Sequence, residues 1–278
     1  MRLQKKYHKY PYLLLLFIHS SLLMYTFIKS KNRKRTFIAL FSNIGMAYIF
    51  EYFTYNIFKA YRYKPALLKS KNLDSILGAI FSQAIFIPFT ALYISVFHLG
   101  WKFKLLASLY FASIEHLFVR LDIYKHYWWR TIYTLILLPV YFSITTKWEE
   151  LLKKRNPVIL FVSYFNLILV TSVNFLFFLS ILGKVRFGFR RFTSWREHFI
   201  LMPLYSILMG LFTAQTLKEK NTLQFNVKSL FYRLLLDWLL VKIKIIKFSK
   251  KNVLLNLPYH VLMLLLANFY KSLVYNRK

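Results

Sequence analysis

Acidic residues inside apolar stretches are the groups in this sequence best suited to chemistry. The chain has 9 Asp and Glu against 40 Lys and Arg, and two of the acids, Glu51 and Glu115, lie within long hydrophobic runs. If these runs cross a membrane, an ionised carboxylate there costs about 3 kcal/mol unless it is paired, protonated or hydrated. Each acid therefore indicates either a structural group or a site for a substrate, ion or proton. A structural acid would pair with an arginine, for example Arg120 or Arg130, or would stay neutral and bond to a tyrosine.

The densest group of polar side chains lies in the tract Ser113–Thr131, SIEHLFVRLDIYKHYWWRT. If a helix runs through it, Glu115, Asp122 and His126 lie near one face. Such a stripe favours proton relay or a divalent metal held by two carboxylates and an imidazole. The alternative is a helix end at headgroup level whose charges are solvated and whose Trp128 and Trp129 set its depth.

We therefore predict a polar site within the apolar runs, and we predict no metal and no cofactor. Its members are Glu51, Glu115, His116, Asp122 and His126. The other histidines stand singly, and a lone histidine is more often a hydrogen-bonded packing residue than a ligand.

The same tract, with an acid in an apolar helix followed by Tyr-Lys-His-Tyr-Trp-Trp, resembles a segment of uncharacterised small multi-pass membrane proteins from low-GC Gram-positive bacteria. That resemblance implies a bacterial cytoplasmic membrane. It implies no activity, because none is established for that group.

A second polar tract, Lys184–Arg196, alternates basic and aromatic residues. Its side chains Arg186, Arg190, Arg191 and Arg196 are candidate contacts for lipid headgroups or phosphate, with a solvated loop as the alternative. Basic residues border nearly every apolar run instead of gathering on one face, so anionic lipid is the expected partner and nucleic acid is not.

The elements that must position these residues are membrane helices, since 58% of the residues are hydrophobic and 18% are charged. The apolar runs are each about long enough to cross a hydrocarbon core. They cover Pro11–Ile28, Thr36–Phe58, Ser75–Phe97, Phe103–Leu121, Arg130–Thr146, Pro157–Leu182, His198–Thr216 and Val253–Tyr275. The sequence predicts an all-α polytopic transmembrane bundle of about eight spans, within a range of seven to nine. We expect residues 1–278 to form a single integral membrane domain without a separate soluble domain, and the first run to be a retained anchor.

Residues 228–247 are ambiguous because polar side chains follow one helical stripe through them. The stripe contains Asn226, Ser229, Arg233, Asp237, Lys244 and Lys251. We predict an amphipathic helix lying in the membrane interface. The alternative is a further span in which Arg233 and Asp237, four residues apart, pair inside the bundle.

An internal repeat is also indicated, since Glu51 and Tyr63 are spaced like Glu115 and Tyr127, with 64 residues between the two pairs. Paired repeats are a common plan of transporters. The repeat stays a hypothesis at this point, because such matches arise easily in an apolar chain.

Functional motifs of well-known enzyme and pump classes are missing from the sequence. It has no P-loop, dinucleotide fingerprint, His-Glu-x-x-His or Gly-x-Ser-x-Gly, and no cysteine. The leading prediction is a membrane-embedded accessory, sensor or assembly protein, for which a membrane protein partner is expected, and an enzyme is disfavoured. The alternative is a small-solute or proton-linked transporter using Glu51 and Glu115. A third hypothesis is a metal-dependent enzyme acting on lipid through Glu115, Asp122 and His126.

Overall fold

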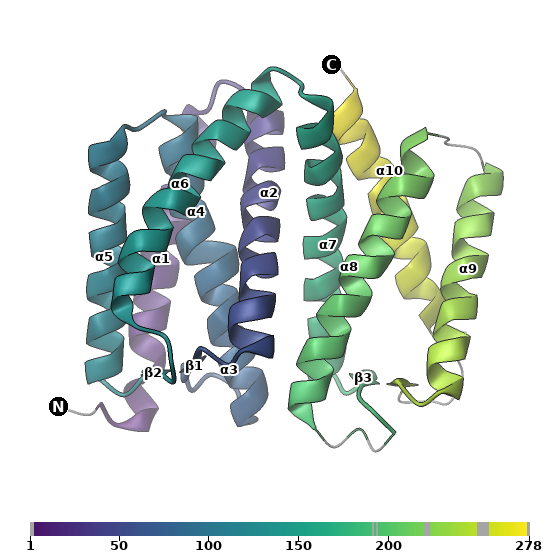
Figure 1. Cartoon of the computed structure of the whole chain (residues 1–278), viewed down its shortest axis with the longest axis horizontal. Coiled ribbons are helices and arrows are strands. Elements are labelled where there is room, and N and C mark those ends of the chain that lie inside the picture. Colours follow the sequence, from purple (N-terminus) through teal and green to yellow (C-terminus); the bar gives the residue numbers. More distant parts are fainter. Residues whose placement is uncertain (1–2, 191, 193, 220–222, 249–255, 277–278) are drawn as a thin grey trace. The chain divides into compact units, whose positions relative to one another are not determined.

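A computed structural model describes residues 3–190, 192, 194–219, 223–248 and 256–276. In these residues the chain is helical apart from short strands and connections (Figure 1). It divides into two compact units, Met1–Ile159 and Leu160–Lys278, which we describe separately. Both units carry helices suited to a membrane, so the expected single membrane domain stays a prediction.

Unit 1 is a helical bundle with a two-stranded antiparallel sheet at one end. In chain order its elements are α1 (Lys9–Lys29), α2 (Arg33–Glu51), the π-helical turn η2 (Tyr52–Ile57), β1 (Tyr61–Tyr63), α3 (Lys71–Ile80), the π-helical turn η3 (Phe81–Phe86), α4 (Ile87–Val96), α5 (Trp101–Arg120), β2 (Tyr124–His126) and α6 (Thr131–Lys153). The helix α4 packs against α1, α2 and α6, and α5 packs against α6. The sheet pairs Tyr61 with His126 and Tyr63 with Tyr124.

Unit 2 repeats this arrangement with fewer elements. It contains α7 (Pro157–Ile181), β3 (Val185–Phe187), α8 (Trp195–Glu219), α9 (Leu223–Lys242), β4 (Ile246–Phe248) and α10 (Leu257–Tyr275). The helices α8, α9 and α10 contact one another. α7 joins them through hydrogen bonds of Ser172 with Ser206 and Tyr259. β3 and β4 pair antiparallel.

Among the residues that the structure describes, six helical segments are long and apolar enough to cross a membrane. They are Lys5–Lys29, Arg33–Ile57, Lys71–Val96, Pro157–Ile181, Trp195–Leu217 and Leu257–Tyr275. All eight predicted apolar runs are helical over most of their length, so the all-α class is confirmed. The helices α5 (20 residues) and α6 (23 residues) are long enough but not sufficiently apolar and free of charge to join the six. Asn156 accepts hydrogen bonds from the amides of Val158 and Ile159 and so caps α7, as its position before Pro157 predicts.

The segment 228–247 differs from the predicted interfacial helix. It holds most of α9 and, after a turn, β4. Ser229, Arg233 and Asp237 of the polar stripe are buried, whereas Phe231 is 62% exposed and Trp238 is 49% exposed. Of the other members, Asn226 is half-buried, Lys244 is exposed beyond the helix, and Lys251 lies outside the described residues. An interfacial helix turns its polar face to water and its apolar face to lipid or protein. α9 instead buries its polar face inside unit 2 and presents an apolar face outward.

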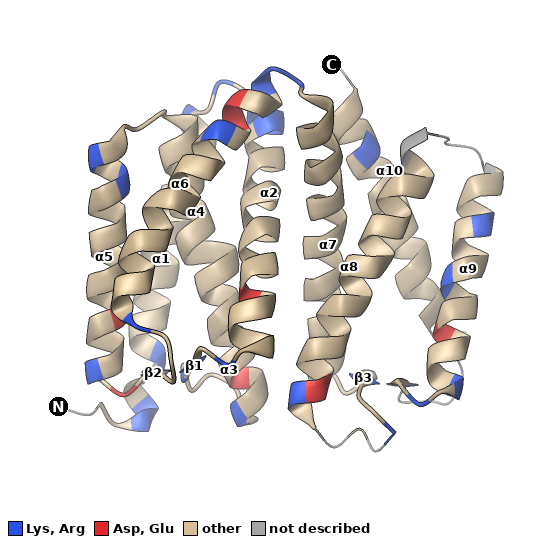
Figure 2. Ribbon diagram, viewed as in Figure 1, with Lys and Arg blue, Asp and Glu red and all other residues tan. Residues whose placement is uncertain are grey.

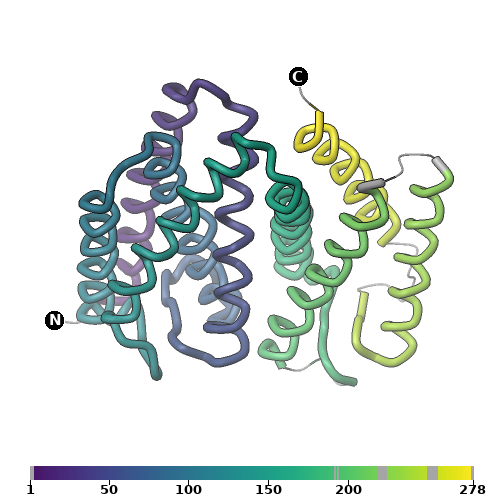
Figure 3. Tube along the Cα trace, turned by 45° about the horizontal axis from the view of Figure 1, so that its top comes forward, coloured from purple at the N-terminus to yellow at the C-terminus, as the bar shows by residue number. Residues whose placement is uncertain are grey.

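In the described residues, one helix–strand–helix pattern occurs four times, twice in each unit. Figure 3 traces the chain through the turns that join the helices of each unit. The strands begin at Tyr61, Tyr124, Val185 and Ile246, and each carries a basic residue between two apolar or aromatic ones. Two residues before each strand the backbone has a positive φ, at Lys59, Asp122, Gly183 and Lys244. The last three of these positions donate to the carbonyl three residues earlier, as in a Schellman helix end. A shared backbone motif at such regular spacing supports the predicted internal repeat and extends it to four copies.

The glycine of α3 allows this helix to lie against β1. A Cβ atom at Gly78 would stand 2.5 Å from the Cβ of Tyr63, whereas one at Gly100 would meet nothing within 4 Å. We expect Gly78→Ala to destabilise the protein by about 1–3 kcal/mol through overpacking. Gly100→Ala, at the start of α5, should cost less than about 1 kcal/mol. Thermal unfolding of both variants in detergent measures the difference, and equal midpoints would contradict this packing.

Candidate functional site

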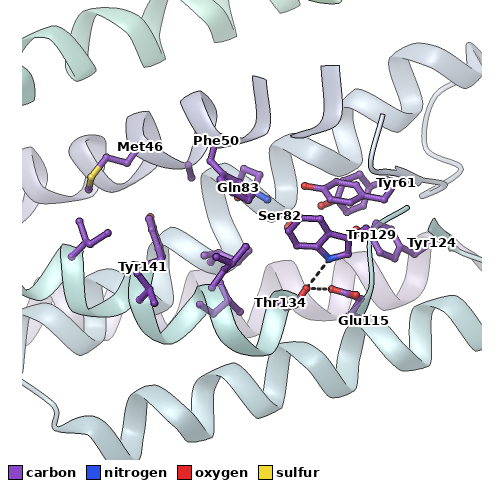
Figure 4. A pocket seen from close by; sticks show the side chains of 17 residues that line it. Met46, Phe50, Tyr61, Ser82, Gln83, Glu115, Tyr124, Trp129, Thr134 and Tyr141 are labelled. Atoms are coloured by element: carbon purple, nitrogen blue, oxygen red, sulfur yellow. Dashed lines mark hydrogen bonds between the residues drawn. The ribbon is translucent and has the colours of Figure 1, made fainter. Parts of the chain in front are cut away.

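A cavity of about 330 Å³ lies within unit 1, between the helices and the paired strands (Figure 4). Side chains from α2, β1, η3, α4, α5, β2 and α6 line it. Its walls are mainly aromatic and aliphatic, and its described lining contains one carboxylate, Glu115, and no Lys or Arg. The chain has 40 Lys and Arg residues, so a lining with a carboxylate and without a described Lys or Arg distinguishes this cavity from the rest of the protein.

Glu115 is held at the cavity wall by a short chain of polar contacts. Thr134 Oγ1 donates to Glu115 Oε2 at 2.5 Å, and Trp129 Nε1 donates to Thr134 Oγ1 at 3.0 Å. His126 Nε2 lies 2.8 Å from Glu115 Oε1, close enough for an ion pair when the ring is protonated. The orientation of these two groups does not make a hydrogen bond. Oε1 is therefore a buried oxygen that lies against the imidazole of His126.

Glu51 does not line the cavity but contacts two residues that do. Its Oε2 accepts from Tyr61 Oη at 2.5 Å and from Gln83 Nε2 at 3.2 Å, and both of these partners line the cavity. Its Oε1 is buried and has no hydrogen-bond partner. The structure therefore separates the two predicted acids, with Glu115 in contact with the cavity and Glu51 supporting its wall.

Two π-helical turns shape this site. Glu51 stands ten residues before the start of β1, whereas Glu115 stands nine residues before the start of β2. The extra residue lies in η2, which directly follows Glu51. The two acids are therefore 64 residues apart in the sequence, whereas the two strands begin 63 residues apart. η3 carries Ser82 and Gln83, both of which line the cavity. π-Helical insertions are frequent at functional sites because they redirect side chains without ending the helix.

An aromatic cluster at the strands forms one end of the cavity. The ring centroids of Tyr61 and Trp129 are 5.4 Å apart, and those of Tyr63 and Tyr124 are 4.9 Å apart. Burial raises the pKa of the Tyr63 phenol well above the ordinary value, and the nearby Glu51 raises it further. Burial also raises the pKa of the Tyr124 phenol, to which Tyr63 contributes. These phenols therefore stay neutral at physiological pH and supply ring faces and dipoles instead of charge.

The other predicted site residues lie elsewhere. The helix ends at Arg120 and the backbone turns at Asp122 (φ 61°), so the tract Ser113–Thr131 is not one helix. Asp122 pairs with Lys64 Nζ at 2.5 Å, and the side chain of His116 is exposed on α5. Of the proposed metal-binding stripe, only Glu115 and His126 come together. Among the residues that the structure describes, no three His, Asp or Glu side chains gather in a geometry suited to a metal.

The predicted phosphate-contact arginines lie at and after β3. The Arg186 guanidinium stacks 3.3 Å above the centre of the Trp195 ring, and burial lowers its pKa. Arg190 and Arg196 are exposed. Arg191 lies outside the described residues. Their contact with phosphate or lipid headgroups stays a prediction.

Unit 2 contains a buried polar network around Asp237, whose partners Tyr205, Asn256 and His260 the sequence does not indicate. Asp237 accepts from Tyr205 Oη at 2.8 Å, from Asn256 Nδ2 at 2.5 Å and from His260 Nε2 at 2.9 Å. Asp237 and His260 are fully buried, and Arg233, one helical turn away, donates to Thr213. Asp237 stands nine residues before its strand, as Glu115 does. It is therefore the counterpart of Glu115 in the fourth repeat.

One sequence signal for these sites was available, namely an acid nine or ten residues before a triplet with a basic residue between two ring-bearing or aliphatic residues. It links Glu51, Glu115 and Asp237 across the repeats. No such pattern identifies the residues that contact these acids, namely Gln83, Thr134 and His260. Only the tertiary fold brings these residues to the acids. No protein-family model, curated protein or solved structure matches this chain.

Proposed function

We propose that the protein is a membrane carrier for a small organic cation, bound in the cavity of unit 1 with Glu115 as its counter-charge. The observation that carries this proposal is the lining of the cavity, which combines a carboxylate with Tyr61, Tyr124 and Trp129 and contains no described Lys or Arg. Aromatic ring faces attract cations by about 0.5–2 kcal/mol each, and more strongly when water is excluded. A volume of about 330 Å³ suits a molecule of drug-fragment size.

His126 positions the counter-charge in this proposal, because its Nε2 lies 2.8 Å from Glu115 Oε1. The ring of Tyr124 supports the imidazole, since the two ring centroids are 5.1 Å apart.

The topology that serves this function places α5, α6 and α9 across the membrane beside the six apolar segments. Each of the three presents large apolar side chains outward, for example Leu106 (62% exposed), Ile136 (57%) and Phe231 (62%). The chain would then cross nine times, at the upper limit of the predicted range. A location in a bacterial cytoplasmic membrane is part of the proposal.

The accessory, sensor or assembly role ranks behind the carrier. It rests on sequence features without a defined site, whereas Glu115 lies in a formed cavity. A membrane protein partner that copurifies in fixed stoichiometry, without any cation binding, would restore that role to first place.

A further inference from the structure

We propose that unit 1 has a second binding site, separate from the cavity, for the phosphate of an anionic membrane lipid. A pocket of about 430 Å³ lies where the segment before α1 meets the end of β1 and the start of α3. Four Lys or Arg side chains line it, against two Asp. The basic residues are Lys5, Arg62, Lys64 and Lys71, and the acidic residues are Asp74 and Asp122.

Both carboxylates of this pocket are already engaged. Asp74 accepts hydrogen bonds from the backbone amides of Ala66, Leu67 and Leu68 at 2.7–2.9 Å. Asp122 pairs with Lys64. Lys5, Arg62 and Lys71 have no carboxylate partner among the described residues, although Arg62 Nη2 donates to the carbonyl oxygen of Lys71 at 3.3 Å. The pocket therefore has positive charge to offer to an anion.

The pairing of β1 and β2 adds to this charge. Arg62 lies directly opposite Lys125 in the sheet, and like charges in opposed positions destabilise a strand pair. A bound phosphate would relieve that repulsion. His8 holds the pocket together, since its ring nitrogens lie 3.2 Å from the carbonyl oxygen of Lys64 and 3.0 Å from that of Leu3.

A lipid, and not a soluble phosphate, fits the surroundings of the pocket. The residues before α1 that line it lead directly into an exposed apolar face, with Leu14 60% and Phe17 72% exposed. Tyr7 and Tyr10 are also exposed at this end, and tyrosines favour the headgroup layer. Figure 2 shows basic residues at this end of α1 and α3, and between its ends α1 contains no Lys, Arg, Asp or Glu. A phosphate in the pocket would leave acyl chains free to lie along α1.

Native mass spectrometry of the full chain in detergent, titrated with phosphatidylglycerol or phosphatidylcholine, tests the site. We expect one tightly retained phosphatidylglycerol that phosphatidylcholine does not replace. The variant Lys5→Gln/Arg62→Gln/Lys71→Gln should weaken its retention at least about 10-fold, because each basic group near a membrane contributes roughly a factor of five. The control Lys29→Gln/Lys31→Gln/Arg33→Gln removes the same charge from exposed positions between α1 and α2 and should leave retention unchanged.

Several results would overturn the proposal. Equal losses in the two triple variants would indicate unspecific charge attraction, and equal retention of both lipids would remove the phosphate specificity. Displacement of phosphatidylglycerol by glycerol phosphate at equal concentration would assign the pocket to a soluble phosphate. If the triple variant fails to fold, the single Lys71→Gln, at an exposed position, gives the same comparison with a smaller expected loss. Cation binding in the cavity is independent of all these outcomes.

Discussion

Glu115→Gln should lower the affinity for a quaternary ammonium probe about 100-fold while the protein remains folded. The substitution keeps the size of the side chain and its hydrogen bond with Thr134, but it removes the only carboxylate of the described cavity lining. Losing one partner of a buried charge pair costs about 2–5 kcal/mol, and 1.4 kcal/mol corresponds to a factor of ten. Calorimetric titration of the purified variant in detergent measures the change.

The matched control is Glu51→Gln. Glu51 contacts the cavity only through Tyr61 and Gln83, so its substitution should change affinity less than about 10-fold and act through the position of the wall. Equal losses in the two variants would contradict the division of roles between the acids. A Glu115→Gln protein that loses its thermal transition would identify Glu115 as a structural group, in line with the alternative that the sequence leaves open.

Asp237→Ala should destabilise the protein by about 3–5 kcal/mol, the cost of breaking a buried charged network. Tyr205, Asn256 and His260 all donate to this carboxylate. Its removal leaves these buried donors without their acceptor, and each unsatisfied buried polar group costs about 1–3 kcal/mol. Thermal unfolding followed by circular dichroism measures the loss.

Glu150→Ala is the control for this prediction. Glu150 pairs with Lys147 three residues away on α6, and its side chain is 41% exposed. An exposed pair of this kind contributes about 0.3–0.5 kcal/mol, so the variant should unfold close to the wild type. If Asp237→Ala were no less stable than Glu150→Ala, Asp237 would not be the centre of a buried network.

The sequence is sufficient to predict the helical class and most helix ends, because long apolar runs bounded by basic residues leave few alternatives. α7 begins at Pro157 as predicted, and α2 with η2 ends one residue before the predicted Phe58. The error at α9 has a physical cause. A stripe of polar residues predicts an amphipathic helix, but it does not reveal whether water or other buried polar groups satisfy that stripe. Here Thr213 and His260 are those groups.

The site was predictable in part, since the rarity of acids draws attention to Glu51 and Glu115. Their different roles depend on which side chains β1, η3 and α6 bring to them, and those contacts join residues far apart in sequence. The break after Arg120 had a weaker signal. Asp tolerates the left-handed conformation that ends the helix at position 122, and the following Ile-Tyr-Lys-His-Tyr suits a strand.

The most direct test of the carrier proposal compares a cation with its neutral isostere. Choline and 3,3-dimethylbutanol have nearly the same shape, and only choline carries a charge. We expect the wild-type chain at pH 8 to bind one choline per molecule at least about 10-fold more tightly than the alcohol, as one cation–π contact plus a carboxylate requires. Equal affinities, or no saturable binding of either compound, would show that the acidic cavity of unit 1 is not a cation site.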